Sequence, residues 1–322
     1  MNVQFLLNSG KNPKWAYYLK NTFLCALPRF FFRFHSKYLI NDLEQRSDFQ
    51  YIIDRVNYYN RLSDVVLSNE AQLIKENKKE DNMSSVYFYD SQVIAKYFNP
   101  TLKWFTCFGD VIHVPNHPSI VKSRPLVENN ENSVILKLEK VRHFIFLNDK
   151  KSFNEKQDKV IFRGKIDGKL PRIQFIEKFF DNPNFDVANV SKNKEYQKWQ
   201  KDKMTLWKHL DYKFIMALEG NDVASNLKWI MSSNSIAVMP KPTCETWFME
   251  GTLLPNIHYL EIKNDFSDLE ERIQWCNNNP IKAEEIIKNA NLYTKQFLDY
   301  KREKIISILV LEKYFEKTNQ II

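Results

Sequence analysis

The second half of the chain alternates short apolar runs with amphipathic segments, and this order constrains the fold more than any other feature. The apolar runs are rich in β-branched and aromatic residues, which is typical of strands. The expected strands are 160–163, 185–190, 212–218, 236–239 and 258–262. Helices are expected at 171–180, 223–231 and 267–277, with a short one near 246–253. Strands that alternate with helices pair in parallel, so the order predicts an α/β fold with a parallel sheet covered by helices.

The first half of the chain and its end are less regular. Sequences of the capping-box type at 47–50 and 267–270 predict two helix starts. A helix is expected at 51–59 and a proline-rich loop at 114–125. Strands are expected at 86–89, 103–108, 134–138 and 144–147. The polar segment 148–158 is expected to link two lobes, and 281–318 to be helical throughout.

The overall charge predicts an anionic partner. Lys and Arg number 47 against 39 Asp and Glu, which gives a net charge of +8. A nucleotide, a nucleic acid, a phosphorylated glycan and a lipid surface all fit this balance. The four cysteines form no C-x-x-C pair, which favours a reduced, cytoplasmic protein. The apolar start is too short for a secretory signal, and no stretch reaches the roughly 18 apolar residues that span a bilayer.

One apolar segment leaves two interpretations open. Residues 22–34 (TFLCALPRFFFRF) are strongly apolar but contain Arg29 and Arg33. Further cations lie nearby: Lys11, Lys14, Lys20 and Lys37. The segment either lies on an anionic membrane surface or forms a buried helix–turn element with a basic exposed face. We favour the buried element.

Two polar segments follow predicted strands of the second half, where open parallel sheets bind ligands. In the first, 160–172, four cations flank a glycine-containing loop before a helix, which suits a diphosphate. These cations are Arg163, Lys165, Lys169 and Arg172. In the second, 219–229, Gly220 and Asn221 make a turn before a helix whose first N–H groups, 223–225, would face a ligand. A solvated basic loop and an ordinary capped helix are the plainer alternatives.

A third segment, 107–124, offers a general base. Asp110 follows a predicted strand and a glycine, and a carboxylate placed there can accept a proton from a hydroxyl. A turn-forming aspartate is the plainer alternative. His113 and His117 lack a third metal ligand in the sequence. No Asp-x-Asp, P-loop, G-x-G-x-x-G or G-x-S-x-G occurs, which argues against ATPase, dinucleotide-oxidoreductase and serine-hydrolase functions.

Together these segments resemble glycosyltransferase family 90. The motifs that carry the resemblance are FRGK at 162–165, EGNDVASNLKWIMSSNS at 219–235, ETWF at 245–248 and the run 253–275. In the first half, GDVIHVPNHPSIVKSRP at 109–125 resembles the bacterial members. The family includes lipopolysaccharide-core glycosyltransferases, capsule xylosyltransferases and protein O-glucosyltransferases.

The resemblance implies a GT-B-like fold with two Rossmann-like lobes, a donor cleft between them and a helical C-terminus. Residues 1–150 would form the acceptor-side lobe and 151–290 the nucleotide-sugar-binding lobe, with the helices of 291–322 packing back on the first lobe. The implied reaction is an inverting, metal-independent transfer of a hexose from UDP-glucose or another UDP-hexose, without a cofactor. The acceptor would be a lipopolysaccharide or lipooligosaccharide core, that is, a glycolipid or oligosaccharide.

The resemblance also assigns residues. By motif position, the catalytic base falls on Asp110, and two donor-binding residues fall on Lys165 and Arg172. The donor-binding loop falls on Asn221, Asp222, Val223, Ala224, Ser225 and Asn226. The family often has arginine in place of Asn226, so Lys228 or Arg163 is the candidate for that charge. Glu245 lies where an acidic residue holds the ribose hydroxyls in many GT-B enzymes.

Two other functions remain as alternatives. The first is a capsule or protein O-glycosyltransferase of the same family. The second is a basic nucleic-acid-binding protein, although no recognised reader motif occurs. The transferase interpretation predicts a cytoplasmic protein, with peripheral contact to the anionic inner face of the membrane as a further expectation and no nucleic-acid partner.

Overall fold

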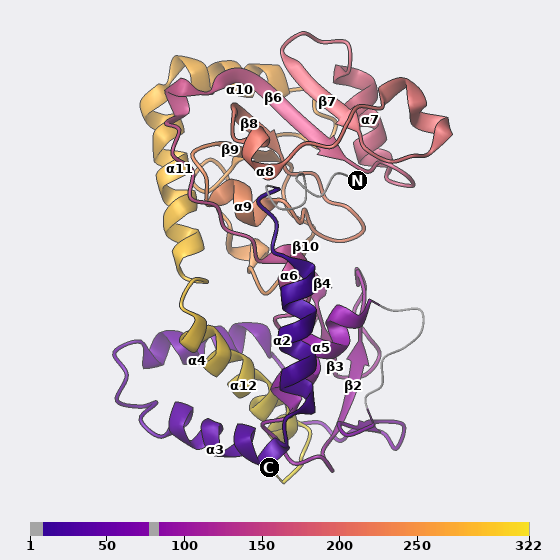
Figure 1. Ribbon diagram of the computed structural model, residues 1–322, viewed down its shortest axis with the longest axis vertical. Helices are drawn as coiled ribbons and strands as arrows, with labels where there is room; N and C mark the ends of the chain where they lie inside the picture. Colours follow the sequence, from indigo (N-terminus) through magenta and orange to yellow (C-terminus); the bar gives the residue numbers. More distant parts are fainter. Residues whose placement is uncertain (1–8, 77–83, 322) are drawn as a thin grey trace. The chain divides into compact units, whose positions relative to one another are not determined.

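The computed structural model describes residues 9–76 and 84–321, which form two compact units (Figure 1). One unit, the five-stranded unit, comprises Arg142–Pro242 and Thr252–Gln296 with the segment that ends at Asn12. The other, the four-stranded unit, comprises Pro13–Val141, Thr243–Gly251 and the segment from Phe297 onward. Each unit is therefore assembled from separate stretches of chain.

The five-stranded unit is built on a sheet with the strand order β11-β9-β8-β6-β7. All neighbouring strands pair in parallel, as the alternation of strands and helices predicts. The strands are β6 (Gln157–Gly164), β7 (Phe185–Asn189), β8 (Tyr212–Met216), β9 (Ile236–Met239) and β11 (Leu260–Glu261). The helices are α7 (Leu170–Phe179), α8 (Leu206–His209), α9 (Leu227–Met231), α10 (Leu269–Asn278) and α11 (Pro280–Lys295), with short 3₁₀ turns η1 (Phe153–Glu155) and η2 (Lys194–Trp199).

Aromatic side chains hold this sheet to its helices. Phe162 of β6 and Phe175 of α7 meet edge to face, with ring centroids 5.6 Å apart. Both are buried in one core with Phe214 of β8, Leu269 of α10 and Ile286 of α11. Burying each such side chain contributes roughly 1.5–3 kcal/mol, so this core fixes the strand ends that carry the loops.

The four-stranded unit contains a sheet with the order β1-β2-β3-β5, in which only β1 is antiparallel to its neighbour. A separate antiparallel pair joins β4 to β10. The strands are β1 (Gln72–Leu73), β2 (Lys103–Cys107), β3 (Ser119–Val121), β4 (Ser123–Pro125), β5 (Ser133–Ile135) and β10 (Cys244–Thr246). The helices are α2 (Lys14–Ala26), α3 (Arg29–Ile40), α4 (Phe49–Tyr59), α5 (Ser85–Ala95) and α12 (Tyr300–Lys317), with the 3₁₀ turn η3 (Glu250–Thr252). The four-residue helix α6 (Lys140–His143) lies where the chain passes from one unit to the other.

A buried charge cluster ties the returning segments into the four-stranded unit. Glu303 of α12 accepts hydrogen bonds from Arg55 of α4 at 2.5 Å, Lys137 at 2.7 Å and the Trp247 indole at 2.6 Å. Together with Glu303, these three partners come from four places in the chain, and α12 also packs along α4. Breaking a buried ion pair on one side costs several kcal/mol, so the cluster favours this one arrangement of the segments.

Several sequence-based expectations were wrong. Residues 86–89, expected as a strand, lie in helix α5. The helix was missed because it is buried on most sides, so its sequence shows no helical periodicity. No strand forms at 144–147, and the expected helix near 246–253 is replaced by β10 and η3. The helix expected at 223–231 begins only at Leu227. The stretch 281–318 is two helices, because Asp299 caps a new helix with a 3.0 Å bond from the amide of Arg302.

The capping boxes expected at 47–50 and 267–270 do not form. Asp48 and Asp268 occupy the N-cap positions without a side-chain cap bond. Asp48 pairs with Arg46 at 2.8 Å, and Asp268 accepts from the amide of Lys263 at 2.9 Å. The polar segment 148–158, expected as a linker, lies within the five-stranded unit, where Asp149 accepts from Lys156 at 2.7 Å.

The interpretation of residues 22–34 as a buried element was also wrong. On α2 only Asn21 is buried, and on α3 only Phe32 and Leu39. Of the other large apolar side chains of these two helices, some are half-buried, and seven are exposed: Trp15, Leu19, Phe23, Phe30, Phe31, Phe34 and Tyr38. Among the described residues, no helix combines the length and the apolar character needed to cross a membrane.

Candidate active site

The carboxyl edge of the five-stranded sheet gathers the loops that the sequence marks as donor-binding. The loop after β6 carries Lys165 and Lys169, and the loop after β8 runs from Ala217 to Asn226. Because β6 and β8 are neighbours in the sheet, these two loops lie side by side. Ligands of open parallel sheets bind at this edge, so the topology places the expected basic residues where a ligand is expected.

Arg172 joins these two loops. From the first turns of α7, its guanidinium donates to the carbonyl oxygens of Lys165 at 2.9 Å, Leu218 at 2.7 Å and Glu219 at 2.9 Å. Gly220 makes room for it, since a Cβ there would lie 3.2 Å from Nη2 of Arg172. A guanidinium has five N–H groups, so two remain for a ligand after these three bonds within the described residues.

The surroundings of Arg172 disfavour its charge. Burial, followed by the nearby positive charge of Arg142, lowers its pKa from 12.5 to about 10. A desolvated cation next to a second cation is stabilised by an anion, because the anion restores the charge balance that water would supply. Lys165 is exposed at the same loop and Lys169 is half-buried. The arrangement suits a phosphate group.

Arg163 turns away from this edge. It donates to Asp186 of β7 at 2.6 Å and to the carbonyl oxygens of Phe162 and Asp186. Although burial acts to raise the pKa of Asp186, hydrogen bonds from Arg163, Tyr212 and Lys201 lower it to about 2. Arg163 is therefore engaged in a strand-to-strand ion pair, and its part in donor binding stays a prediction.

The loop after β8 is irregular until Leu227. Asn221 is exposed, Asp222, Val223 and Ala224 are buried, and Ser225 is half-buried. Asn226 donates from its side chain to the carbonyl of Met216 at 2.9 Å, which closes the loop onto the end of β8. Because α9 has only five residues, its dipole stabilises an anion less than the dipole of the longer helix expected from the sequence would. Lys228, on α9, has no exposed surface.

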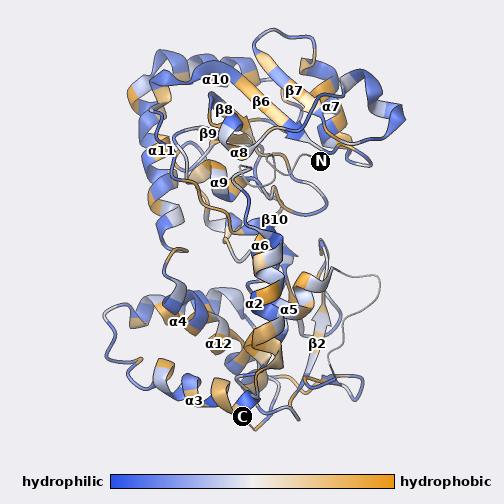
Figure 2. Cartoon of the chain, viewed as in Figure 1, coloured by the Kyte–Doolittle hydropathy of each residue, from blue (hydrophilic) through white to orange (hydrophobic). Residues whose placement is uncertain are grey.

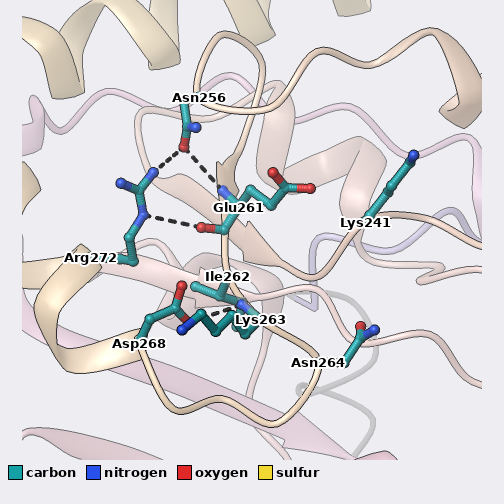
Figure 3. Close-up of a pocket in the computed structure, with 8 residues that line it drawn as sticks. All are labelled: Lys241, Asn256, Glu261, Ile262, Lys263, Asn264, Asp268 and Arg272. Atoms are coloured by element: carbon teal, nitrogen blue, oxygen red, sulfur yellow. Dashed lines mark hydrogen bonds between the residues drawn. The ribbon is translucent and has the colours of Figure 1, made fainter.

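A pocket of about 490 Å³ lies further along the same sheet, beyond the ends of β9 and β11 (Figure 3). Its charged lining comprises the cations Lys241, Lys263 and Arg272 and the acids Glu261 and Asp268. Arg272 donates to the Asn256 side chain and to the carbonyl of Glu261, which fixes its guanidinium against the pocket wall (Figure 3). None of the expected donor-binding residues lines this pocket. The position of Lys241 after a predicted strand was the signal that could have identified it.

In the four-stranded unit, Asp110 lies beside a buried lysine. Lys122 contacts Asp110 Oδ1, and its Nζ lies 3.6 Å from Oε2 of Glu139. The three groups follow the carboxyl ends of the neighbouring parallel strands β2, β3 and β5. The Asp110 side chain is 24% exposed whereas that of Lys122 is 2% exposed. Asp110 thus lies beside a buried cation and still reaches solvent, a position from which a carboxylate can act as a general base.

The local backbone explains how Asp110 reaches this position. Gly109 has φ +118°, a conformation that residues with a Cβ rarely adopt, and it turns the chain sharply after β2. Glu139 was missed in the sequence, because it lies 29 residues from Asp110 and outside the singled-out segments. His113 and His117 are exposed, and His117 stacks on Phe105 with ring centroids 4.7 Å apart.

Glu245 belongs to the four-stranded unit. It pairs across β4 and β10 with Arg124 at 2.8 Å, and Tyr58 donates to its second oxygen. Both side chains of the ion pair are completely buried. A ribose would have to displace these bonds, so the proposed ribose contact of Glu245 stays a prediction.

Comparison with known proteins decides the family. The model of the family described as glycosyl transferase family 90 matches residues 132–317, which is more than half of the chain. The chain belongs to glycosyltransferase family 90. This family 90 chain is therefore a glycosyltransferase, and the alternative of a nucleic-acid-binding protein falls away.

The relatives of the family 90 chain include bacterial, animal and viral proteins. It is 40% identical over 264 residues to O-glucosyltransferase LpsA of Dichelobacter nodosus, which covers 82% of each chain. It is 27% identical over 172 residues to protein O-glucosyltransferase 3 of Homo sapiens, covering 52% of this chain and 33% of the human protein. It is also 33% identical over 122 residues to the uncharacterized protein 179R of Invertebrate iridescent virus 6, covering 34% of this chain and 10% of the viral one.

Proposed function

We propose that this enzyme transfers a hexose, with inversion and without a metal ion, from a UDP-sugar to the oligosaccharide core of a lipopolysaccharide or lipooligosaccharide. The observation that carries the proposal is Arg172, a desolvated cation held by three carbonyl groups at the carboxyl edge of the five-stranded sheet. UDP-glucose is the proposed donor, because two of the relatives are named glucosyltransferases. We further propose that the two units are the lobes of a GT-B fold.

In the proposed reaction, Asp110 accepts the proton of an acceptor hydroxyl. The hydroxyl oxygen attacks the anomeric carbon from the face opposite the UDP group, which inverts that carbon. The bond from the anomeric carbon to the β-phosphate oxygen breaks, and its electron pair leaves with UDP. Arg172 and Lys165 stabilise the negative charge that grows on the diphosphate, a role that a divalent cation fills in other transferases.

The glycan acceptor is proposed from the resemblance of 109–125 to the bacterial members of the family, and the match to the bacterial O-glucosyltransferase LpsA, which covers 82% of the chain, agrees with that branch. The match to protein O-glucosyltransferase 3 covers 52% of the chain, and it favours the second candidate, transfer to a protein. We further propose that the enzyme acts in the cytoplasm, at the inner face of the cytoplasmic membrane.

A thermal-shift screen tests the donor. UDP and UDP-glucose are expected to raise the melting temperature, because a ligand at about 100 times its Kd stabilises a fold by about 2.7 kcal/mol. ADP and GDP share the diphosphate but not the base, and we expect smaller shifts from them. Equal shifts with all three nucleotides would contradict uridine recognition, and no shift with any of them would contradict the donor site.

A further inference from the structure

Helix α3 exposes a row of aromatic side chains to solvent. Phe30, Phe34 and Tyr38 are spaced four residues apart and therefore lie along one side of the helix. Their exposed fractions are 62%, 75% and 71%, and the adjacent Phe31 is 50% exposed. The opposite side of α3 is anchored, since Phe32 and Leu39 are buried. The outward side of this helix is therefore apolar without being part of the core.

Helix α2 repeats the pattern. Trp15, Leu19 and Phe23 follow the same spacing, with exposed fractions of 70%, 67% and 63%. Its other side packs against α5, where Tyr17 donates to Asp90 at 2.8 Å. Figure 2 shows the hydrophobic residues along α2 and α3. We call the six residues named for these two rows, together with Phe31, the aromatic face.

The charges within α2 and α3 all have one sign, and the acidic Asp42 and Glu44 follow only after the end of α3. Between Ser9 and Asn41 the chain contains six Lys and Arg residues and no Asp or Glu. Of these, Arg29 is engaged in the fold, because it donates to the carbonyls of Ala95 and Phe98. The other five are exposed: Lys11, Lys14, Lys20, Arg33 and Lys37. On α3, Arg33 and Lys37 flank the aromatic row by the helical periodicity.

We propose that the aromatic face docks this enzyme on an anionic lipid bilayer, with α3 lying in the interface. Phe, Tyr and Trp side chains enter the boundary between headgroups and acyl chains, and neighbouring cations bind anionic headgroups. With 12 and 13 residues, α3 and α2 are about 20 Å long, too short to cross a core of roughly 30 Å. A second copy of the chain is a poorer occupant, because a symmetric contact would bring cations against cations.

Sedimentation with vesicles tests this docking. The full chain is expected to bind vesicles of phosphatidylcholine with about 30% phosphatidylglycerol at least tenfold more tightly than pure phosphatidylcholine, and to lose most of this preference in about 0.5 M salt. The variant Phe30→Ser/Phe34→Ser/Tyr38→Ser is expected to bind at least tenfold more weakly. Since these side chains are exposed, the variant should fold, and circular dichroism checks this.

Matched controls separate the face from general surface effects. The variant Val66→Ser/Ile281→Ser/Leu292→Ser also removes three exposed apolar side chains, at 78%, 73% and 52% exposure, and should bind vesicles like the wild type. Arg33→Gln/Lys37→Gln should reduce binding to the anionic vesicles by roughly fivefold for each lost cation.

Three results would overturn the proposal. The first is vesicle binding that does not depend on anionic lipid, and the second is unchanged vesicle binding of the α3 triple variant. The third is that the wild type sediments as a dimer whereas the triple variant sediments as a monomer. The last result would assign the face to a second copy. No nucleotide is present in the vesicle assay, so a failure of the membrane-docking proposal would not bear on the proposed UDP-sugar site.

Discussion

Arg172 allows the sharpest test of the donor site, because its contributions to stability and to binding can be separated. Replacing it with alanine removes three hydrogen bonds to neutral carbonyl groups. Because the donor is charged, each bond contributes about 1.5 kcal/mol at the low end for such bonds, or about 4.5 kcal/mol for the three. The lowered pKa of about 10 means that the charge is disfavoured by a similar amount, since each pKa unit corresponds to about 1.4 kcal/mol. The two terms offset each other.

Arg172→Ala is therefore expected to change the free energy of unfolding by less than about 2 kcal/mol, which is within the usual range for single substitutions. The loss of UDP affinity is not offset in this way. Charge-assisted bonds to phosphate contribute about 1.5–3 kcal/mol, so affinity should fall roughly 10- to 150-fold. Arg172→Lys keeps the charge but loses the planar set of donors, and should lie between alanine and wild type.

Titration calorimetry gives the affinity for UDP, and chemical denaturation gives the free energy of unfolding. The matched control is Lys159→Ala, which removes an exposed cation of β6 and should leave both unchanged. If Arg172→Ala binds UDP within twofold of wild type but loses more than about 3 kcal/mol of stability, Arg172 only holds the loops together and the reasoning fails.

The remaining predictions concern the base, the metal and pH. Asp110→Asn should keep the fold and UDP binding but lower turnover by at least about 10²-fold. The control Asp211→Asn, at an exposed ion pair with Lys151, should leave turnover unchanged. Near-normal turnover of Asp110→Asn would remove Asp110 from the mechanism. Activity should survive EDTA, and its loss with recovery on adding Mg²⁺ or Mn²⁺ would contradict charge stabilisation by Arg172 and Lys165 alone. Burial lowers the pKa of His209 to about 4, so its contribution to stability is present above the unfolded pKa of about 6.5 and is lost as pH falls through about 4. This loss should approach about 3 kcal/mol in denaturation curves, and a His209→Gln variant with the same pH dependence would show that another group is responsible.

The sequence predicted the five-stranded sheet well, because its strands are short apolar runs and most of them are followed by a helix. It misread 86–89, where a buried helix carries the same aromatic and β-branched residues that mark a strand. Such a segment is decided by its tertiary surroundings, which local patterns do not contain.

The candidate site was predictable in its segments but not in its contacts. Arg163 and Arg172 belong to one basic segment, yet one pairs with Asp186 on the next strand and the other reaches the carbonyls of the β8 loop. Whether a side chain points to a neighbouring strand or to the sheet edge depends on pairing between distant residues. The same holds for Arg124 and Glu245, which are 121 residues apart in the chain.

Transfer of labelled glucose tests the central claim most directly. The full chain is incubated with UDP-glucose carrying a radiolabel in the sugar and with a deacylated lipopolysaccharide core, in the presence of EDTA, beside the Asp110→Asn variant. We predict labelled oligosaccharide whose new linkage has the anomeric configuration opposite to that of the donor, at a rate at least about 10²-fold higher for wild type than for the variant. Retention of the anomeric configuration, or the absence of both transfer and UDP release with UDP-glucose and other UDP-hexoses, would contradict the account.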